Sequence, residues 1–168
     1  MRYILITVMF LLSLILPGTL FHFWAWSGIK PDLLMLLTIY MAAHHRRLSS
    51  LLWGLGAGLL EDFYLGRYIG MYTLTLLVVA FLSNWLTERW YRENFLLTTF
   101  MVFIVTAVGQ ICVAFLALGA GLQWSMADIA QLVFGVALYN AVLVPITYPL
   151  IHRSFQYGWL RYRPRYER

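Results

Sequence analysis

Two neighbouring carboxylates are the side chains of this sequence with the clearest chemical potential. Glu61 and Asp62 are adjacent, and paired carboxylates can serve as general acid and base in an enzyme. Neighbours on a helix point to different faces, so these two do not converge on one substrate atom. No nucleophile, base and orienting group occur at suitable spacing. We therefore expect no catalytic residues, and we expect that the protein is not an enzyme.

The histidines and the single cysteine do not form a pattern typical of a metal site. His44 and His45 are adjacent, whereas metal ligands on a helix usually stand three or four residues apart. Cys112 is the only cysteine and lies in an apolar run, so it has no partner for a disulfide or a thiolate metal site. The sequence predicts neither a metal site nor a cofactor.

Glycines and one acid recur at an unbroken spacing of four in the middle of the chain, at Gly54, Gly58, Asp62, Gly66 and Gly70. The first two glycines share one helical face and let another helix approach closely, either in this chain or in a partner. The last two permit a tight turn. Asp62 is then solvated at a membrane edge, caps this turn, or pairs with a cation; turn capping needs the fewest assumptions.

Polar side chains inside the apolar stretches identify helix contacts. Asn140 and Gln110 lie within long uncharged runs, where an amide side chain seeks a hydrogen-bond partner on another helix. Pro145 and Pro149 follow Asn140 and free backbone carbonyl groups, which predicts a bend. These residues have a structural explanation, and that explanation does not exclude a functional one.

The elements that position these residues follow from the composition. The chain has 168 residues, of which 62% are hydrophobic and 11% are charged. Soluble proteins have about 45–50% apolar and about 25% charged residues. This composition excludes a soluble enzyme, a disordered tail and a secreted disulfide scaffold. The long uncharged runs include 3–29, 68–87, 94–127 and 129–152, and a membrane-spanning helix needs about 20 mostly apolar residues.

We predict an all-α integral membrane protein with six transmembrane helices in a single domain, residues 1–168. Pro31 and Asp32 open the second span, with the proline in the first helical turn, and His45 and Arg46 close it. A basic tail at 152–168 follows the last span and would lie beside anionic lipid, so the positive charge indicates membrane lipid rather than nucleic acid. The predicted spans are about 3–24, 31–45, 48–64, 71–86, 95–118 and 129–151.

The basic residues set the predicted orientation. With six crossings and both termini cytoplasmic, ten of the 12 Lys and Arg residues lie on the inner side. This distribution satisfies the positive-inside rule. A re-entrant hairpin of the second and third segments is the alternative, because both have short uncharged cores; it would leave eight of the 12 inside. We expect the six-crossing arrangement.

The sequence resembles the family of the rod shape-determining protein MreD. The resemblance rests on Pro31-Asp32, His45-Arg46, the Gly54 to Gly70 pattern with Asp62, and Asn140 followed by Pro145, and it extends over the whole chain. It implies a multi-pass protein of the bacterial inner membrane that acts in the cell-elongation machinery without catalysis. It also implies direct binding to MreC, a bitopic protein. Through MreC the family is connected to MreB and to the RodA/class B penicillin-binding protein synthase of lateral-wall peptidoglycan.

The alternative is a small-solute binder. In overall layout, chains of this kind are similar to the substrate-binding subunits of energy-coupling-factor vitamin transporters, which also have six helices. Those subunits typically have an Ala-x3-Ala signature on the first helix for docking their transmembrane partner. In this chain no alanine precedes Ala25, which disfavours the transporter interpretation.

Overall fold

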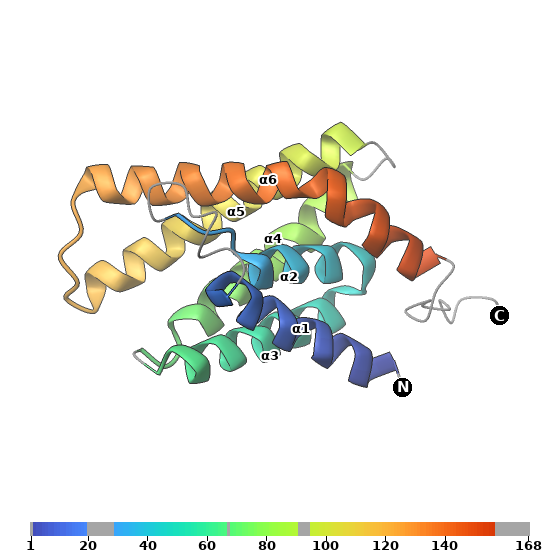
Figure 1. Cartoon of the computed structure of the whole chain (residues 1–168), viewed down its shortest axis with the longest axis horizontal. Coiled ribbons are helices and arrows are strands. Elements are labelled where there is room, and N and C mark those ends of the chain that lie inside the picture. Colours follow the sequence, from blue (N-terminus) through green and yellow to red (C-terminus); the bar gives the residue numbers. More distant parts are fainter. Residues whose placement is uncertain (1, 20–28, 67, 91–94, 157–168) are drawn as a thin grey trace.

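The structure is a computed structural model that describes residues 2–19, 29–66, 68–90 and 95–156, and these residues form six helices (Figure 1). Most of the predicted basic tail lies outside the described residues. The helices are α1 (Arg2–Thr19), α2 (Leu33–His44), α3 (Arg47–Leu65), α4 (Met71–Trp90), α5 (Phe95–Gly119) and α6 (Met126–Gln156).

Three of these helices are long and apolar enough to cross a membrane. The qualifying stretches are Met71–Arg89, Phe95–Gly119 and Met126–Pro149. Shorter apolar stretches occupy Ile6–Pro17 in α1 and Leu33–His44 in α2. The all-helical architecture is therefore that expected of a helical membrane protein. Six crossings remain a prediction.

The short helix α2 is the centre of the bundle. Nine of its 12 residues are buried, and it contacts each of the other five helices (Figure 1). At 1.5 Å per residue the helix is about 18 Å long, less than the about 30 Å of a bilayer core. The non-helical residues 29–32 precede it, and fully extended they add about 13 Å.

The helix boundaries differ from the expected spans in three places. Pro31 lies before α2 rather than in its first turn, because Asp32 is the N-cap and accepts a hydrogen bond from the Met35 N–H. Helix α4 continues to Trp90, beyond the apolar run, because charged residues such as Glu88 are good helix formers. Helix α6 starts early, since Ser125 and Asp128 exchange hydrogen bonds that cap its first turn.

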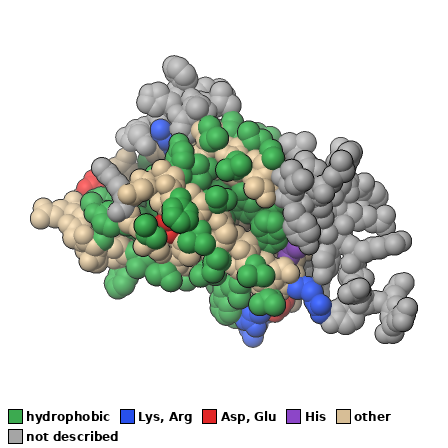
Figure 2. Space-filling model, turned by 90° about the horizontal axis from the view of Figure 1, so that it is seen from below, with side chains coloured by type: hydrophobic (Ala, Val, Ile, Leu, Met, Phe, Trp, Pro, Cys, Tyr) green, Lys and Arg blue, Asp and Glu red, His purple; other side chains and the backbone are tan. Residues whose placement is uncertain are grey.

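Helix α6 bends in its second half, the part that contains Pro145 and Pro149 (Figure 1). A proline removes one backbone donor and clashes with the preceding turn, which accounts for the bend. The surface agrees with an apolar environment: seen from below, hydrophobic side chains are spread over much of the described surface, and acidic side chains show in only a few places (Figure 2).

Candidate functional site

Asp62 joins the end of α3 to the start of α4. Its carboxylate is buried, with 1% of the residue exposed. One oxygen accepts the Tyr72 N–H at 2.9 Å, and the other accepts the Gly70 N–H at 2.9 Å and the Thr73 N–H at 3.1 Å. The Thr73 hydroxyl also donates to it, at 2.5 Å. The carboxylate thus satisfies N–H groups at the start of α4, where a negative charge is also favourable for the helix dipole. We call this set of contacts the Asp62 junction.

The turn between these two helices depends on glycine. Gly66 ends α3 with a φ of 63°, and its N–H donates to the Asp62 carbonyl. Gly70 has a φ of 102°. Both values lie in a region that favours residues without a Cβ atom. Asp62, Gly66 and Gly70 therefore form one turn, and the hydrogen bonds are those that the turn-capping interpretation requires.

Gly54 and Gly58 hold α3 against α4 within this chain. A Cβ atom at Gly54 would lie 2.7 Å from the Leu76 carbonyl oxygen, and one at Gly58 would lie 2.8 Å from the Tyr72 carbonyl oxygen and collide with the Thr73 Cα. Contact with backbone atoms leaves little room for adjustment. Of the two arrangements left open by the sequence, the structure has the internal one.

Asp32 and Asn140 form a second junction, between α2 and α6. The Asp32 N–H donates to the Asn140 side-chain oxygen, and the Asn140 amide donates to the Asp32 carbonyl, both at 3.1 Å. Gln110 of α5 donates to the Asp32 carboxylate at 3.2 Å, and Asn140 also lies 3.4 Å from the Thr106 hydroxyl. We call this the Asp32 junction. It supplies the partners that Asn140 and Gln110 were expected to need.

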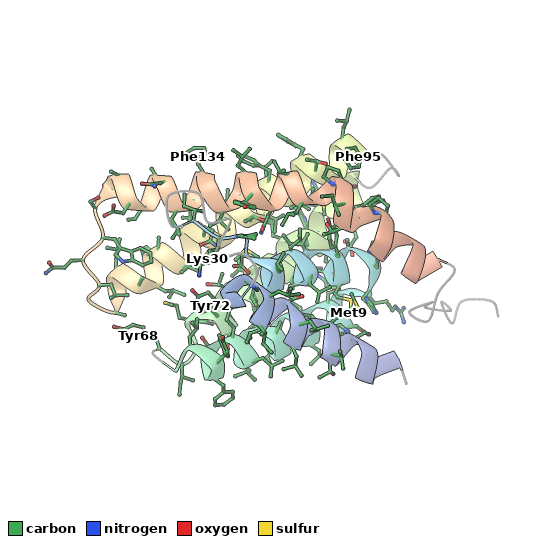
Figure 3. All side chains as sticks on the ribbon, viewed as in Figure 1. Met9, Lys30, Tyr68, Tyr72, Phe95 and Phe134 are labelled. Carbon is green, nitrogen blue, oxygen red and sulfur yellow. The ribbon has the colours of Figure 1, made fainter. Side chains whose placement is uncertain are left out.

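The two junctions lie at the same end of the bundle, which is formed by the start of α2, the end of α3 and the start of α4. Tyr72 of α4 is within electrostatic range of both Asp32 and Asp62. Figure 3 shows Lys30 and Tyr72 at similar positions along the long axis of the molecule. We call this region the acidic end and define it by Asp32, Glu61 and Asp62.

Sequence reasoning missed the environment of Glu61. It placed Glu61 on a different face from Asp62, yet Glu61 is within electrostatic range of both Asp32 and Asp62. Its Oε2 atom is buried and has no hydrogen-bond partner. No spacing in the sequence signals this environment, because it depends on how other helices pack around the end of α3.

His45 and Arg46 lie between the end of α2 and the start of α3, at the other end of these helices from the acidic end. His45 ends α2 and is buried, with Nδ1 3.0 Å from the Met41 carbonyl oxygen. Arg46 is the N-cap of α3 without a side-chain cap. Asn84 of α4 donates to the carbonyls of Ala42 and His45, at 3.2 and 3.0 Å. These contacts tie α4 to the connection between α2 and α3, and the sequence reasoning did not single out Asn84.

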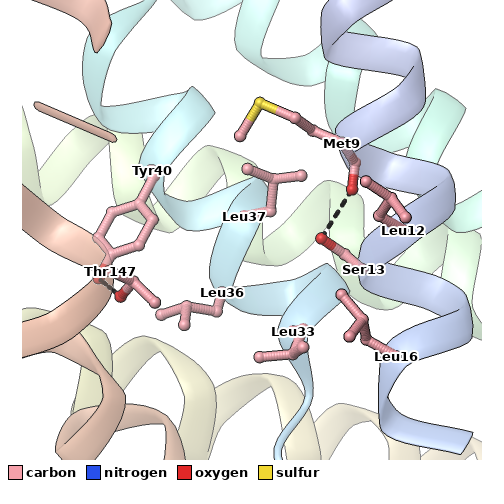
Figure 4. Close-up of a pocket in the computed structure, with 9 residues that line it drawn as sticks. All are labelled: Met9, Leu12, Ser13, Leu16, Leu33, Leu36, Leu37, Tyr40 and Thr147. Atoms are coloured by element: carbon pink, nitrogen blue, oxygen red, sulfur yellow. Dashed lines mark hydrogen bonds between the residues drawn. The ribbon is translucent and has the colours of Figure 1, made fainter. Parts of the chain in front are cut away.

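An apolar cavity of about 240 Å³ lies between α1, α2 and α6 (Figure 4). Its polar groups already have partners. The Ser13 hydroxyl donates to the Met9 carbonyl at 2.8 Å, and the Tyr40 and Thr147 hydroxyls are 2.9 Å apart. The cavity therefore presents apolar surface to any occupant. Its lining residues are Met9, Leu12, Ser13, Leu16, Leu33, Leu36, Leu37, Tyr40 and Thr147.

A helical bundle with three helices able to cross a membrane, joined by buried polar contacts, is the architecture of a helical membrane protein. Within the described residues no group of three or more His, Cys, Asp and Glu side chains is placed to hold a metal ion. The family model of the rod shape-determining protein MreD matches residues 1–157, and the chain belongs to this family. No curated protein and no solved structure matches the chain.

Proposed function

We propose that this chain is a non-catalytic membrane scaffold of the bacterial cell-elongation machinery. In this proposal it binds MreC directly. Through MreC it supports MreB and the RodA/class B penicillin-binding protein synthase in lateral-wall peptidoglycan synthesis and cell-shape maintenance. The observation that carries the proposal is the match to the MreD family over residues 1–157.

The proposal includes a multi-pass topology in the inner membrane, with six crossings, both termini cytoplasmic and a layout like that of energy-coupling-factor substrate-binding subunits. Two observations support it. The described residues form six helices, and α2 together with residues 29–32 can reach about 30 Å, the thickness of a bilayer core. The six-crossing arrangement also places ten of the 12 basic residues inside.

Within this proposal, the residues singled out by the sequence serve to shape the scaffold. Gly54, Gly58 and Asp62 fix the α3–α4 hairpin, while Asp32 and Asn140 fix α2 against α6. A partner would then meet a rigid arrangement of helix faces rather than a mobile one, which lowers the cost of ordering on binding.

Function is tested by replacement of MreD in a rod-shaped bacterium. The chain is expressed as the only MreD, together with its own MreC, and cell width and MreC capture in detergent are measured. Rods and co-purified MreC are expected. Round cells with folded, membrane-inserted protein that captures no MreC would contradict the proposal.

Topology is tested separately with single cysteines at positions 46 and 67 in a Cys112→Ala background. A membrane-impermeant maleimide added to intact cells should label position 67 and spare position 46. Labelling of position 46 from outside would contradict six crossings with cytoplasmic termini.

A further inference from the structure

Glu61 is a partly buried acid with one enclosed oxygen that has no partner. Its Oε2 atom is inaccessible and accepts no hydrogen bond. Among the residues that the structure describes, none forms an ion pair with it. An ionised carboxylate out of water is costly unless it is paired, and ionisable groups in membrane segments usually pair or mark a functional site.

The other two carboxylates of the acidic end are already occupied. Asp62 accepts four hydrogen bonds within its junction. Asp32 accepts from the Met35 N–H and from the Gln110 amide. Glu61 is therefore the member of the acidic end with free acceptor capacity, and Asp32 and Asp62 add negative potential around it.

The surface of α3 beside Glu61 has exposed apolar side chains that a helix of another protein could cover. Side chains three and four positions away lie next to it on α3. Of these, Tyr64 and Leu65 are 59% and 46% exposed, whereas Ala57 and Gly58 are buried against the rest of the bundle. Glu61 thus stands at the border between the packed face of α3 and an open apolar face.

We propose that Glu61 receives a lysine or arginine side chain from the membrane-spanning segment of a partner protein that packs on this open face of α3. The inference rests on the proposed function, in which that partner is the single-span protein MreC. A cation beside Glu61 neutralises the carboxylate from the open side, while the partner's apolar side chains cover Tyr64 and Leu65.

A protein cation fits better than the other cations available to a membrane protein. No group of three ligands in the described residues is placed to hold a metal ion. A zwitterionic lipid headgroup brings a phosphate with its ammonium group, and the three carboxylates of the acidic end would repel that phosphate. A lysine or arginine brings positive charge alone.

The test compares Glu61→Gln with Glu88→Gln, both expressed with full-length MreC. Glu88 is exposed near the end of α4, so its substitution controls for the loss of one acid. We expect Glu61→Gln to weaken MreC binding about 30-fold or more, because a desolvated charge pair loses one partner. Glu88→Gln should bind like the wild type. The thermal midpoint of Glu61→Gln without MreC should equal or exceed that of the wild type, since the substitution removes a partly desolvated carboxyl group that has no partner.

Charge exchange supplies the second measurement. Each lysine and arginine in or beside the MreC span is replaced by glutamate and tested against Glu61→Lys. Recovery of binding in one such pair supports the proposal, and recovery in none overturns it. Wild-type binding by a folded Glu61→Gln variant also overturns it while leaving the proposed function intact.

Two further outcomes identify other failures. If Glu61→Gln keeps MreC but loses bound phosphatidylethanolamine in native mass spectrometry, a lipid headgroup is the occupant and the proposal is wrong. If the wild-type chain captures no MreC at all, the proposed function fails together with this inference.

Discussion

The two polar junctions of the acidic end use a carboxylate in different ways. At the Asp62 junction the side chain accepts hydrogen bonds from residues 8, 10 and 11 positions away. At the Asp32 junction the backbone of Asp32 pairs with the side chain of Asn140, 108 positions away. The first junction therefore shapes one hairpin, whereas the second fastens a central helix to a distant one.

This difference determines how each junction should fail. Loss of the Asp62 carboxylate leaves several donors at the start of α4 without a partner in an apolar environment, which is unfavourable. Loss of the Asn140 amide leaves the Asp32 N–H unpaired, whereas the Asp32 carbonyl keeps its bond from the Leu36 N–H. We therefore expect the hairpin to be the more sensitive region.

The largest effect is expected for Gly58→Leu. Its side chain must enter the space filled by the backbone of Tyr72 and Thr73. Overpacking costs about 1–3 kcal/mol, and contact with backbone places this site at the upper end. Gly56→Leu is the matched control, because a Cβ atom there meets nothing within 4 Å. Unfolding in detergent measures both, and equal stability of the two variants would contradict the close contact of α3 with α4.

Substitution of Asp62 comes next. Asp62→Ala removes all four acceptor contacts, and we expect a loss of about 2–3 kcal/mol. Asp62→Asn can turn its one oxygen toward Gly70 and Thr73, but its NH2 group then faces the Tyr72 N–H, which loses its acceptor. The expected order of stability is wild type, Asn, Ala. If Asn and Ala destabilise the fold equally, charge rather than capping is the role of Asp62.

A smaller effect is expected for Asn140→Ala, which removes the side-chain contacts to Asp32 and Thr106. Hydrogen bonds between membrane helices contribute about 0.6 kcal/mol on average and at most about 1.7, so we expect a loss of about 1–2 kcal/mol. Leu138→Ala, on an exposed position of α6, is the control. A loss larger than that of Asp62→Ala would show that the Asp32 junction, rather than the Asp62 junction, contributes more to stability.

The smallest effect is expected for Tyr40→Phe. It removes the bond between the Tyr40 and Thr147 hydroxyls at the apolar cavity and keeps the buried ring. Thr147 retains its bond to the Leu143 carbonyl. We expect a loss of about 0.6 kcal/mol. A loss as large as that of Asn140→Ala would mean that these two polar contacts contribute equally to the free energy of unfolding.

Features of the fold that depend on residues close together in the sequence could be predicted. The Gly54 to Gly70 pattern indicated a close helix contact and a turn, because all of its partners lie within one hairpin. The helices were expected near their observed positions, since apolar length defines them. The family was also predicted, and the match over residues 1–157 confirms it.

What depends on distant residues could not be predicted. Asn140 was expected to need a partner, but nothing in a single sequence identifies the backbone of Asp32 as that partner. The enclosure of the Glu61 Oε2 atom depends on how α2 and α4 pack around the end of α3, and local spacing does not encode this packing. The role of α2 as the central helix likewise follows from contacts with five other helices.

One carboxylate, that of Asp62, fixes the α3–α4 hairpin, and amide hydrogen exchange can test this role at the residues concerned. In the wild type, the amides of Gly70, Tyr72 and Thr73 should be protected, because each donates to Asp62. In Asp62→Ala their exchange should accelerate about tenfold or more, while the amides of α2 keep their protection. Unchanged exchange of these three amides in Asp62→Ala would contradict the claim.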